Sequence, residues 1–215
     1  MRPVVLVHGF GSSYVHGWVE NAWPDILADS DFEAIGVDML GHGDAPKPHD
    51  PAAYERGLVE SVEAVLPGEP VDAIGFSLGA ATLLRIATEN ASRFHRLVLM
   101  GIGAHTLGVS TAGAQTISET DDRVLTQLTD SDRNDPAALD ALRRRPQRPF
   151  TDDELARVTV PTLVITSDAD GLAGSPQPLV DKLPNVELKL LRGIDHFQTP
   201  REFGAIDAAV AFLEG

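Results

Sequence analysis

Short apolar runs alternate along the chain with stretches in which apolar residues recur every three or four positions. Most of the short runs, such as Val4–Val7, are continuously apolar, which is typical of strands buried on both faces of a parallel sheet. The predicted strands are Val4–Val7, Ala34–Val37, Val71–Gly75, Leu97–Met100, Thr162–Thr166 and Val186–Leu191. The predicted helices are Val19–Ala28, Tyr54–Leu66, Leu78–Glu89, Pro178–Leu183 and Phe203–Leu213. The spacing in the last helix predicts one apolar face, formed by Phe203, Ile206, Val210 and Leu213.

This order of elements predicts a single doubly wound α/β domain over residues 1–215, because strand–helix–strand units form parallel sheets through right-handed crossovers. One region, approximately residues 103–158, has no strand-like run and is interpreted as a helical insertion between two strands. An insertion at the carboxyl end of strands commonly covers a ligand crevice. Short helices are predicted around Asp121–Leu128, Pro136–Arg145 and Asp152–Val158, the last with Thr151 and Glu154 at capping-box spacing.

Composition narrows the possible chemistry. The chain has 215 residues, 43% of them hydrophobic, which suits one globular domain. It contains no cysteine, which excludes disulfides, thiolate zinc sites and cysteine nucleophiles. The 17 basic and 32 acidic residues give a formal net charge of −15, which argues against nucleic-acid binding. The start is apolar only as far as Val7, too short for a signal peptide or a membrane span, so we expect a cytoplasmic protein with no membrane partner.

The sharpest motif is Gly75-Phe76-Ser77-Leu78-Gly79, a G-x-S-x-G sequence between a predicted strand and a predicted helix. A strand-to-helix turn this tight needs the flanking glycines and exposes the serine hydroxyl as a nucleophile. The alternative interpretation is a glycine-rich connection in which Ser77 only caps the helix.

An oxyanion formed by attack of Ser77 needs hydrogen-bond donors. We expect the backbone N–H groups of Leu78 and of Phe10 to supply them, since the loop His8-Gly9-Phe10-Gly11 follows the first strand. His8 lies at the end of that buried strand, so we interpret it as holding the loop rather than as a base.

The serine also needs a base and the base needs an acceptor. His196 follows the last predicted strand and is the expected base, whereas His42 in Gly41-His42-Gly43 is interpreted as a loop former. Candidate acceptors are Asp168, Asp170 and Asp195; Asp195 is adjacent to the histidine, which makes a contact awkward.

Taken together, these motifs resemble the α/β-hydrolase superfamily. The resemblance is carried by the His8-Gly9-Phe10 loop, Asp38–Gly43, the elbow around Ser77, Pro161–Asp170 and Gly193–His196. The family's first two strands have no counterpart, which leaves a mostly parallel sheet of about six strands. In the family's P-x-L-x-I-x-G-x-x-D pattern the acid is the last residue, which is Asp170 here. Ser167 stands where that pattern usually has glycine, so Asp168 stays a second candidate.

The resemblance implies a serine hydrolase of the esterase type, with Ser77, Asp170 and His196 as catalytic residues, a small-molecule acyl substrate, and no cofactor or metal. The insertion would be a short cap over a pocket lined by Leu107, Val109, Leu125 and Leu128. The same motifs occur in carbon–carbon bond hydrolases, lactonases, thioesterases, acyltransferases and perhydrolases, which remain alternatives. A further alternative is a binding protein that keeps the triad but uses the pocket as a receptor without catalysis.

Overall fold

The computed structural model describes residues 1–108, 126, 128 and 133–215 and contains a six-stranded sheet in which all neighbouring strands are parallel. The strand order is β2-β1-β3-β4-β5-β6, so the chain starts one strand in from an edge, adds that edge as β2 and then returns past β1 to build the rest of the sheet. This confirms the doubly wound α/β fold expected from the sequence. The strands are β1 (Arg2–Val7), β2 (Phe32–Val37), β3 (Val71–Phe76), β4 (Phe94–Met100), β5 (Thr162–Ser167) and β6 (Val186–Leu191).

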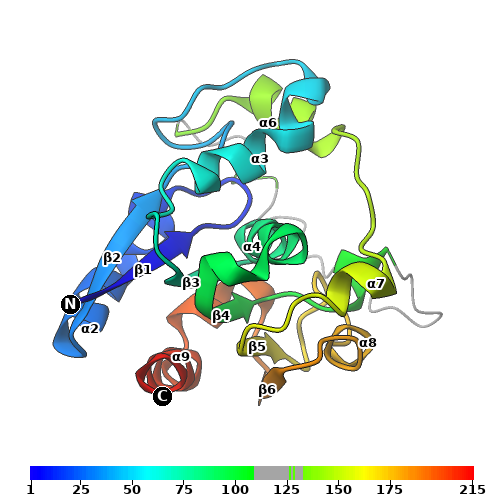
Figure 1. Cartoon of the computed structure of the whole chain (residues 1–215). Helices are drawn as coiled ribbons and strands as arrows, with labels where there is room; N and C mark the ends of the chain where they lie inside the picture. The colour runs from blue at the N-terminus through cyan, green and yellow to red at the C-terminus, as the bar shows by residue number, and fades with distance from the viewer. Residues whose placement is uncertain (109–125, 127, 129–132) are drawn as a thin grey trace.

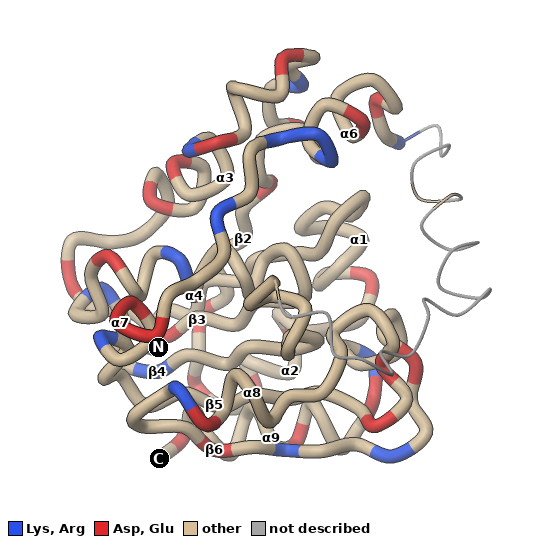
Figure 2. Tube along the Cα trace, turned by 90° about the vertical axis from the view of Figure 1, so that its right-hand side faces the viewer, with Lys and Arg blue, Asp and Glu red and all other residues tan. Residues whose placement is uncertain are grey.

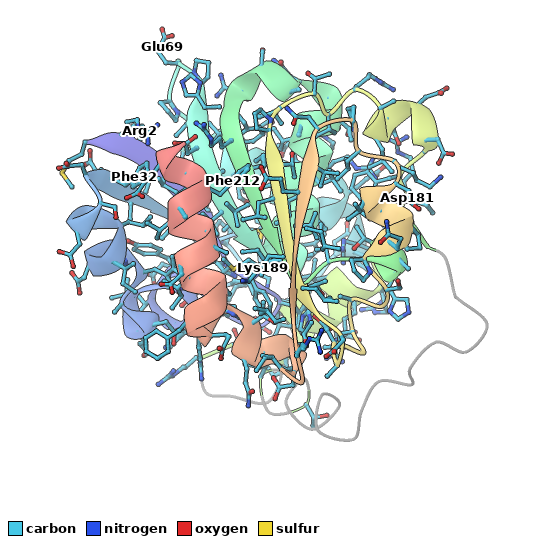
Figure 3. The ribbon with its side chains drawn as sticks, turned by 90° about the horizontal axis from the view of Figure 1, so that it is seen from below. Arg2, Phe32, Glu69, Asp181, Lys189 and Phe212 are labelled. Atoms are coloured by element: carbon cyan, nitrogen blue, oxygen red, sulfur yellow. The ribbon has the colours of Figure 1, made fainter. Side chains whose placement is uncertain are left out.

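Helices cover both faces of the sheet (Figure 1). On one face lie α3 (Tyr54–Glu63), α4 (Leu78–Glu89) and α8 (Gln177–Val180), and on the other lie α2 (Trp23–Asp29) and α9 (Phe203–Glu214). In the view from below, α9 and α8 lie on opposite sides of β5 and β6 (Figure 3). Because all neighbouring strands are parallel, their carboxyl ends lie at one edge of the sheet, where ligand sites of such sheets occur.

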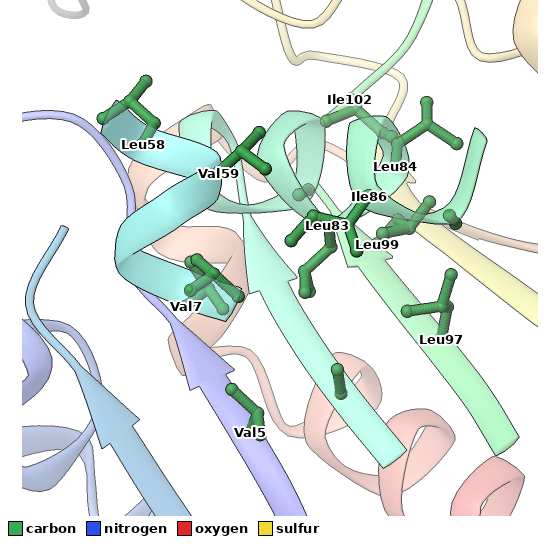
Figure 4. Packing of buried hydrophobic residues seen from close by; sticks show 14 of the residues in the cluster. Val5, Val7, Leu58, Val59, Leu83, Leu84, Ile86, Leu97, Leu99 and Ile102 are labelled. Carbon is green, nitrogen blue, oxygen red and sulfur yellow. The ribbon is translucent and has the colours of Figure 1, made fainter. Parts of the chain in front are cut away.

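Each strand of the central sheet contributes to two hydrophobic clusters because its side chains alternate between faces. In β1, Val5 and Val7 pack with α3 and α4, whereas Val4 and Leu6 pack with α2 and α9. Figure 4 shows part of the first cluster, including Leu83 from α4 and Leu97 and Leu99 from β4. The continuous apolar runs of the sequence are therefore explained by burial on both sides.

The long predicted helix over Val19–Ala28 is divided in the structure. A 3₁₀ turn, η1 (Val19–Asn21), is separated from α2 by Ala22, whose φ of 60° is left-handed. Pro24 follows at the start of α2, where its missing N–H costs no intrahelical hydrogen bond. A short helix, α1 (Tyr14–Gly17), precedes η1 and was not predicted from the sequence.

One expectation about burial is wrong. Phe203 is 80% exposed, and the buried face of α9 consists of Ala205, Ala209 and Leu213. The small alanine side chains face the sheet, which apolar spacing alone does not reveal. β6 is an edge strand with four consecutive exposed residues, which include the charged Glu187 and Lys189.

The connection between β4 and β5 corresponds to the expected insertion at 103–158. Its described part contains η4 (Ala104–Leu107), α6 (Pro136–Arg143) and α7 (Asp152–Leu155). The predicted capping box is present, with Thr151 and Glu154 exchanging hydrogen bonds. The helix predicted around Asp121–Leu128 falls largely outside the described residues. The remaining 3₁₀ turns are η2 (Pro51–Ala53), η3 (Ala91–Arg93) and η5 (His196–Arg201).

Candidate active site

Ser77 lies at the turn between β3 and α4 in a conformation rarely adopted by residues other than glycine, with φ 52° and ψ −112°. Its backbone N–H donates to the Met100 carbonyl at 2.8 Å, which holds the turn against β4. Gly79 makes the turn possible, because a Cβ there would lie 2.6 Å from the His8 carbonyl oxygen. The sequence motif is thus explained by close packing of the turn against the end of β1.

A chain of hydrogen bonds joins Ser77 to a buried carboxylate. The Ser77 Oγ lies 2.9 Å from Nε2 of His196, and Nδ1 of His196 lies 2.9 and 2.8 Å from the two carboxylate oxygens of Asp170. His196 and Asp170 are each only 2% exposed. The three residues come from the ends of β3, β5 and the segment after β6, as the sequence predicted.

Asp170 is held as an acceptor by backbone groups. Its Oδ1 accepts hydrogen bonds from the N–H of Leu172 at 3.1 Å and of Ala173 at 2.8 Å. Because an ionised carboxylate only accepts, its contact with His196 assigns the proton to Nδ1 of the imidazole. Nε2 is then free to accept the proton of the Ser77 hydroxyl.

The other two candidate acids have different partners. Asp168 Oδ1 accepts from the N–H of Gly193 at 2.8 Å, which joins the loop after β5 to the loop after β6. Asp195 caps η5 by accepting from the N–H of Gln198 at 2.9 Å. Of the three acids, Asp170 is the one in hydrogen-bond contact with His196.

The loop after β1 lies against the serine turn. A Cβ on Gly9 would lie 2.8 Å from the ring of Phe76, the residue before Ser77. Phe10 follows in this loop, and Leu78 is the first residue of α4, where N–H groups have no partner within the helix. The arrangement is compatible with the expected role of both backbone N–H groups as oxyanion donors.

His8 and His42 are fully buried behind this loop, with ring centroids 4.9 Å apart. His8 Nε2 accepts from the N–H of Met39 at 3.1 Å and its Nδ1 donates to the Gly9 carbonyl at 2.8 Å. Burial lowers the pKa of His8, and lowers that of His42 to about 3. Both rings are therefore neutral supports of the loop, as expected from their positions in the sequence.

A cavity of about 450 Å³ opens beside Ser77 and His196. Its lining combines aromatic and aliphatic side chains with a few polar ones: Gly9, Phe10, Ser12, His16, Gly17, Trp18, Asn21, Phe76, Leu128, Leu172, Phe197, Pro200 and Arg201. This size and composition are typical of small-molecule sites. A second cavity of about 460 Å³, between α3, α4 and the segment after α6, contains neither Ser77 nor His196.

Of the pocket residues expected from the sequence, Leu128 lines the cavity and packs over Gly11 of the loop after β1. Leu107, at the end of η4, lies in the hydrophobic core instead and is 7% exposed. Val109 and Leu125 lie outside the described residues. Phe76 and Phe197 were missed, although each adjoins a motif residue; Trp18 and Arg201 carry no signal in the sequence.

Among the residues that the structure describes, no group of three or more histidine, aspartate or glutamate side chains is arranged to hold a metal ion. No described helix has both the length and the apolar character needed to cross a membrane. The hydrogen-bond chain through Ser77, His196 and Asp170 offers a hydroxyl beside an imidazole and a buried carboxylate.

Comparison with known proteins agrees with this architecture. A family model described as alpha/beta hydrolase fold matches residues 2–147. A pimeloyl-[acyl-carrier protein] methyl ester esterase of Neisseria meningitidis is 32% identical over 101 residues, covering 46% of this chain and 36% of the esterase. An uncharacterised protein of Mycobacterium tuberculosis is 30% identical over 112 residues, covering 50% of this chain and 31% of that protein. The chain thus aligns with about a third of the length of these curated relatives.

Solved structures match over nearly the whole chain. A serine hydrolase involved in carbazole degradation superimposes with a TM-score of 0.74 at 22% identity, covering 99% of this chain and 91% of the other. The 2-hydroxy-6-oxo-6-phenylhexa-2,4-dienoate hydrolase of Rhodococcus sp. strain RHA1 gives a TM-score of 0.74 at 20% identity, covering 100% and 91%. At these identities the likeness shows a shared fold.

Proposed function

The chain belongs to the alpha/beta hydrolase family, and from this premise we propose that it is a serine hydrolase that cleaves a carboxylic ester or a related acyl substrate. The observation that carries the proposal is the continuous hydrogen-bond chain from Ser77 Oγ through His196 to Asp170. A structural serine has no need of a buried imidazole and carboxylate in line with it, whereas a nucleophile requires them.

In the proposed mechanism, Ser77 Oγ attacks the substrate carbonyl carbon while Nε2 of His196 takes the hydroxyl proton. Asp170 stabilises the resulting imidazolium and keeps the ring oriented. The N–H groups of Phe10 and Leu78 donate to the oxyanion, which is the largest stabilisation expected in this class of reaction.

Collapse of the tetrahedral intermediate breaks the ester bond. His196 returns its proton to the departing alkoxide, and the acyl group stays on Ser77. A water molecule then attacks the acyl-enzyme with His196 again acting as base, which releases the carboxylic acid and restores the serine.

Ester cleavage is favoured over the other reactions of the family by one of the curated relatives, which is named as a methyl ester esterase. We further propose that residues 103–158 act as a cap, because Leu128 from this segment lines the cavity beside Ser77. The short α6 and α7 would leave such a cap small.

The test is hydrolysis of short-chain 4-nitrophenyl esters together with labelling by a fluorophosphonate probe. We expect Ser77→Ala to abolish labelling and to lower kcat/KM by at least about a thousandfold, because the nucleophile is removed. Ser92→Ala is the matched control, since Ser92 is exposed in the turn after α4 and away from the cavity. The proposal fails if the wild-type protein neither hydrolyses any ester nor reacts with the probe while remaining folded by circular dichroism.

A further inference from the structure

The cavity beside Ser77 differs in charge from the rest of the molecule. The chain has 32 acidic and 17 basic residues, yet no described residue lining this cavity is an aspartate or glutamate. Arg201 is the one lining side chain, within the described part of the chain, that is positively charged at every physiological pH. A cavity that is lined by a cationic side chain and by no carboxylate favours the binding of an anionic group.

Two other polar side chains of this wall, those of His16 and Asn21, are already engaged. His16 Nδ1 is 2.7 Å from the Ser13 hydroxyl, and its Nε2 is 3.6 Å from Glu20, which lies outside the lining. Asn21 donates through Nδ2 to the carbonyls of His16 and Gly17 at 3.2 and 2.9 Å. His16 and Asn21 therefore bind neighbouring protein groups; Trp18, which also lines the cavity, has a buried Nε1 with no hydrogen-bond partner among the described residues.

Arg201 is different, because its guanidinium makes no hydrogen bond or ion pair with any residue that the structure describes, and the residue is exposed. Its main chain is nevertheless held firmly. The preceding residue, Pro200, is buried, and its carbonyl accepts a 2.9 Å hydrogen bond from Nε1 of the fully buried Trp23. The main chain that carries the guanidinium is thus fixed in position. The guanidinium can bind an anion without breaking an ion pair within the protein.

We propose that the substrate carries a carboxylate in addition to its ester group, and that Arg201 binds this carboxylate. This inference rests on the proposed function, since it concerns the same cavity. A guanidinium binds a carboxylate through two parallel charge-assisted hydrogen bonds, which orient the substrate as well as attract it. The apolar side chains of Phe76, Leu172 and Phe197 line the same cavity and suit the hydrocarbon between the two groups.

The experiment compares matched pairs of esters that differ in one charge. Mono-4-nitrophenyl adipate and suberate carry a free carboxylate at the end of the acyl chain, and 4-nitrophenyl hexanoate and octanoate are their neutral counterparts. A second pair, 4-carboxyphenyl acetate and phenyl acetate, places the carboxylate on the leaving group. Rates are measured for the wild type, Arg201→Gln and Arg192→Gln, the last removing an exposed arginine that does not line the cavity.

We expect Arg201→Gln to lower kcat/KM for the charged member of at least one pair by about tenfold or more, the effect of losing a hydrogen-bonded charge pair. For the neutral esters, Arg201→Gln should change kcat/KM by less than about twofold. Arg192→Gln should leave the ratio of kcat/KM for the charged and the neutral ester unchanged in every pair, which separates local binding from overall charge. Arg201→Lys should restore part of the preference, because it keeps the charge but loses the planar fork.

The inference is wrong if the ratio of charged to neutral rates is the same in the wild type and in Arg201→Gln for both series. In that case Ser77-dependent hydrolysis of the neutral esters leaves the proposed function intact. If no ester of either kind is cleaved and Ser77 is not labelled by a fluorophosphonate, the proposed function fails and the inference fails with it.

Discussion

Asp168 and Asp170 show how one carboxylate differs from another only two positions away. Both follow β5, but Asp170 is 2% exposed and contacts Nδ1 of His196, whereas Asp168 is exposed and accepts from the backbone of Gly193. A carboxylate that fixes the tautomer of the imidazole contributes to every turnover, while one that joins two loops contributes to local stability.

At this scale we predict that Asp170→Asn lowers kcat by about a thousandfold to ten-thousandfold, because the amide stabilises the wrong tautomer of His196. Asp168→Asn should retain activity within a few-fold. Steady-state hydrolysis of a 4-nitrophenyl ester measures both variants, with urea unfolding as the check on their stability. A larger loss in Asp168→Asn than in Asp170→Asn would assign the acid to Asp168 instead.

Helix α7 is joined to α4 through the carboxylate of Glu154. Oε1 of Glu154 lies 3.3 Å from Nη1 of Arg85 in α4 and 2.6 Å from Nη2 of Arg148. Its Oε2 accepts a hydrogen bond from the N–H of Thr151 at 2.9 Å. The guanidinium of Arg85 in turn stacks over the ring of Phe150, 3.8 Å from its centroid. The hydrogen bond from Thr151, followed by the two arginines, lowers the pKa of Glu154 from 4.5 to about 2.

A lowered pKa means that the folded state favours the ionised carboxylate, so its contribution to stability is complete above pH 4.5 and is lost as the pH falls toward 2. We predict that Glu154→Gln lowers the free energy of unfolding by about 1–2 kcal/mol at pH 7, and that this difference shrinks between pH 4.5 and 3. Urea titrations across this range measure it.

The matched control is Glu69→Gln, which removes the same charge from an exposed loop residue (Figure 3). Glu69→Gln should change the free energy of unfolding by less than about 0.5 kcal/mol both at pH 7 and at pH 3. An effect of Glu154→Gln that is equally large at pH 7 and pH 3 would contradict the proposed ionic origin of the attachment.

Over the whole molecule, negative charge is distributed rather than concentrated. Acidic residues occur on several elements, including α3, α6 and α7 (Figure 2). Because the net charge is −15, the acidic side chains repel one another across the folded molecule. Added salt screens this repulsion.

We predict that raising NaCl from about 20 mM to about 300 mM at pH 7 increases Tm by a few degrees, since each kcal/mol corresponds to about 2–4 °C for a chain of this size. The same series at a pH close to the calculated pI of 4.7 should give a much smaller response, because the net charge is then near zero. Differential scanning calorimetry measures both. A Tm at pH 7 that stays constant or falls with salt would show that attractive ion pairs outweigh the repulsion.

Local patterns in the amino-acid sequence were enough to predict the fold and much of the candidate site. Continuous apolar runs mark strands buried on both faces, and helical spacing marks the crossovers, because local periodicity records which side chains avoid water. Ser77 and His196 were identifiable because their motifs follow strand-like runs, and parallel strands all end at one edge of the sheet.

Tertiary structure alone decided the remaining features. The choice of Asp170 over Asp168, the exposure of Phe203 on α9 and the presence of Trp18 and Arg201 in the cavity all depend on how distant segments are oriented. Ser77 and His196 are 119 residues apart in the chain, yet their side chains are 2.9 Å apart. Local sequence patterns specify which residues prefer burial, but the packing of one layer on another sets the direction of each side chain, and these directions define the site.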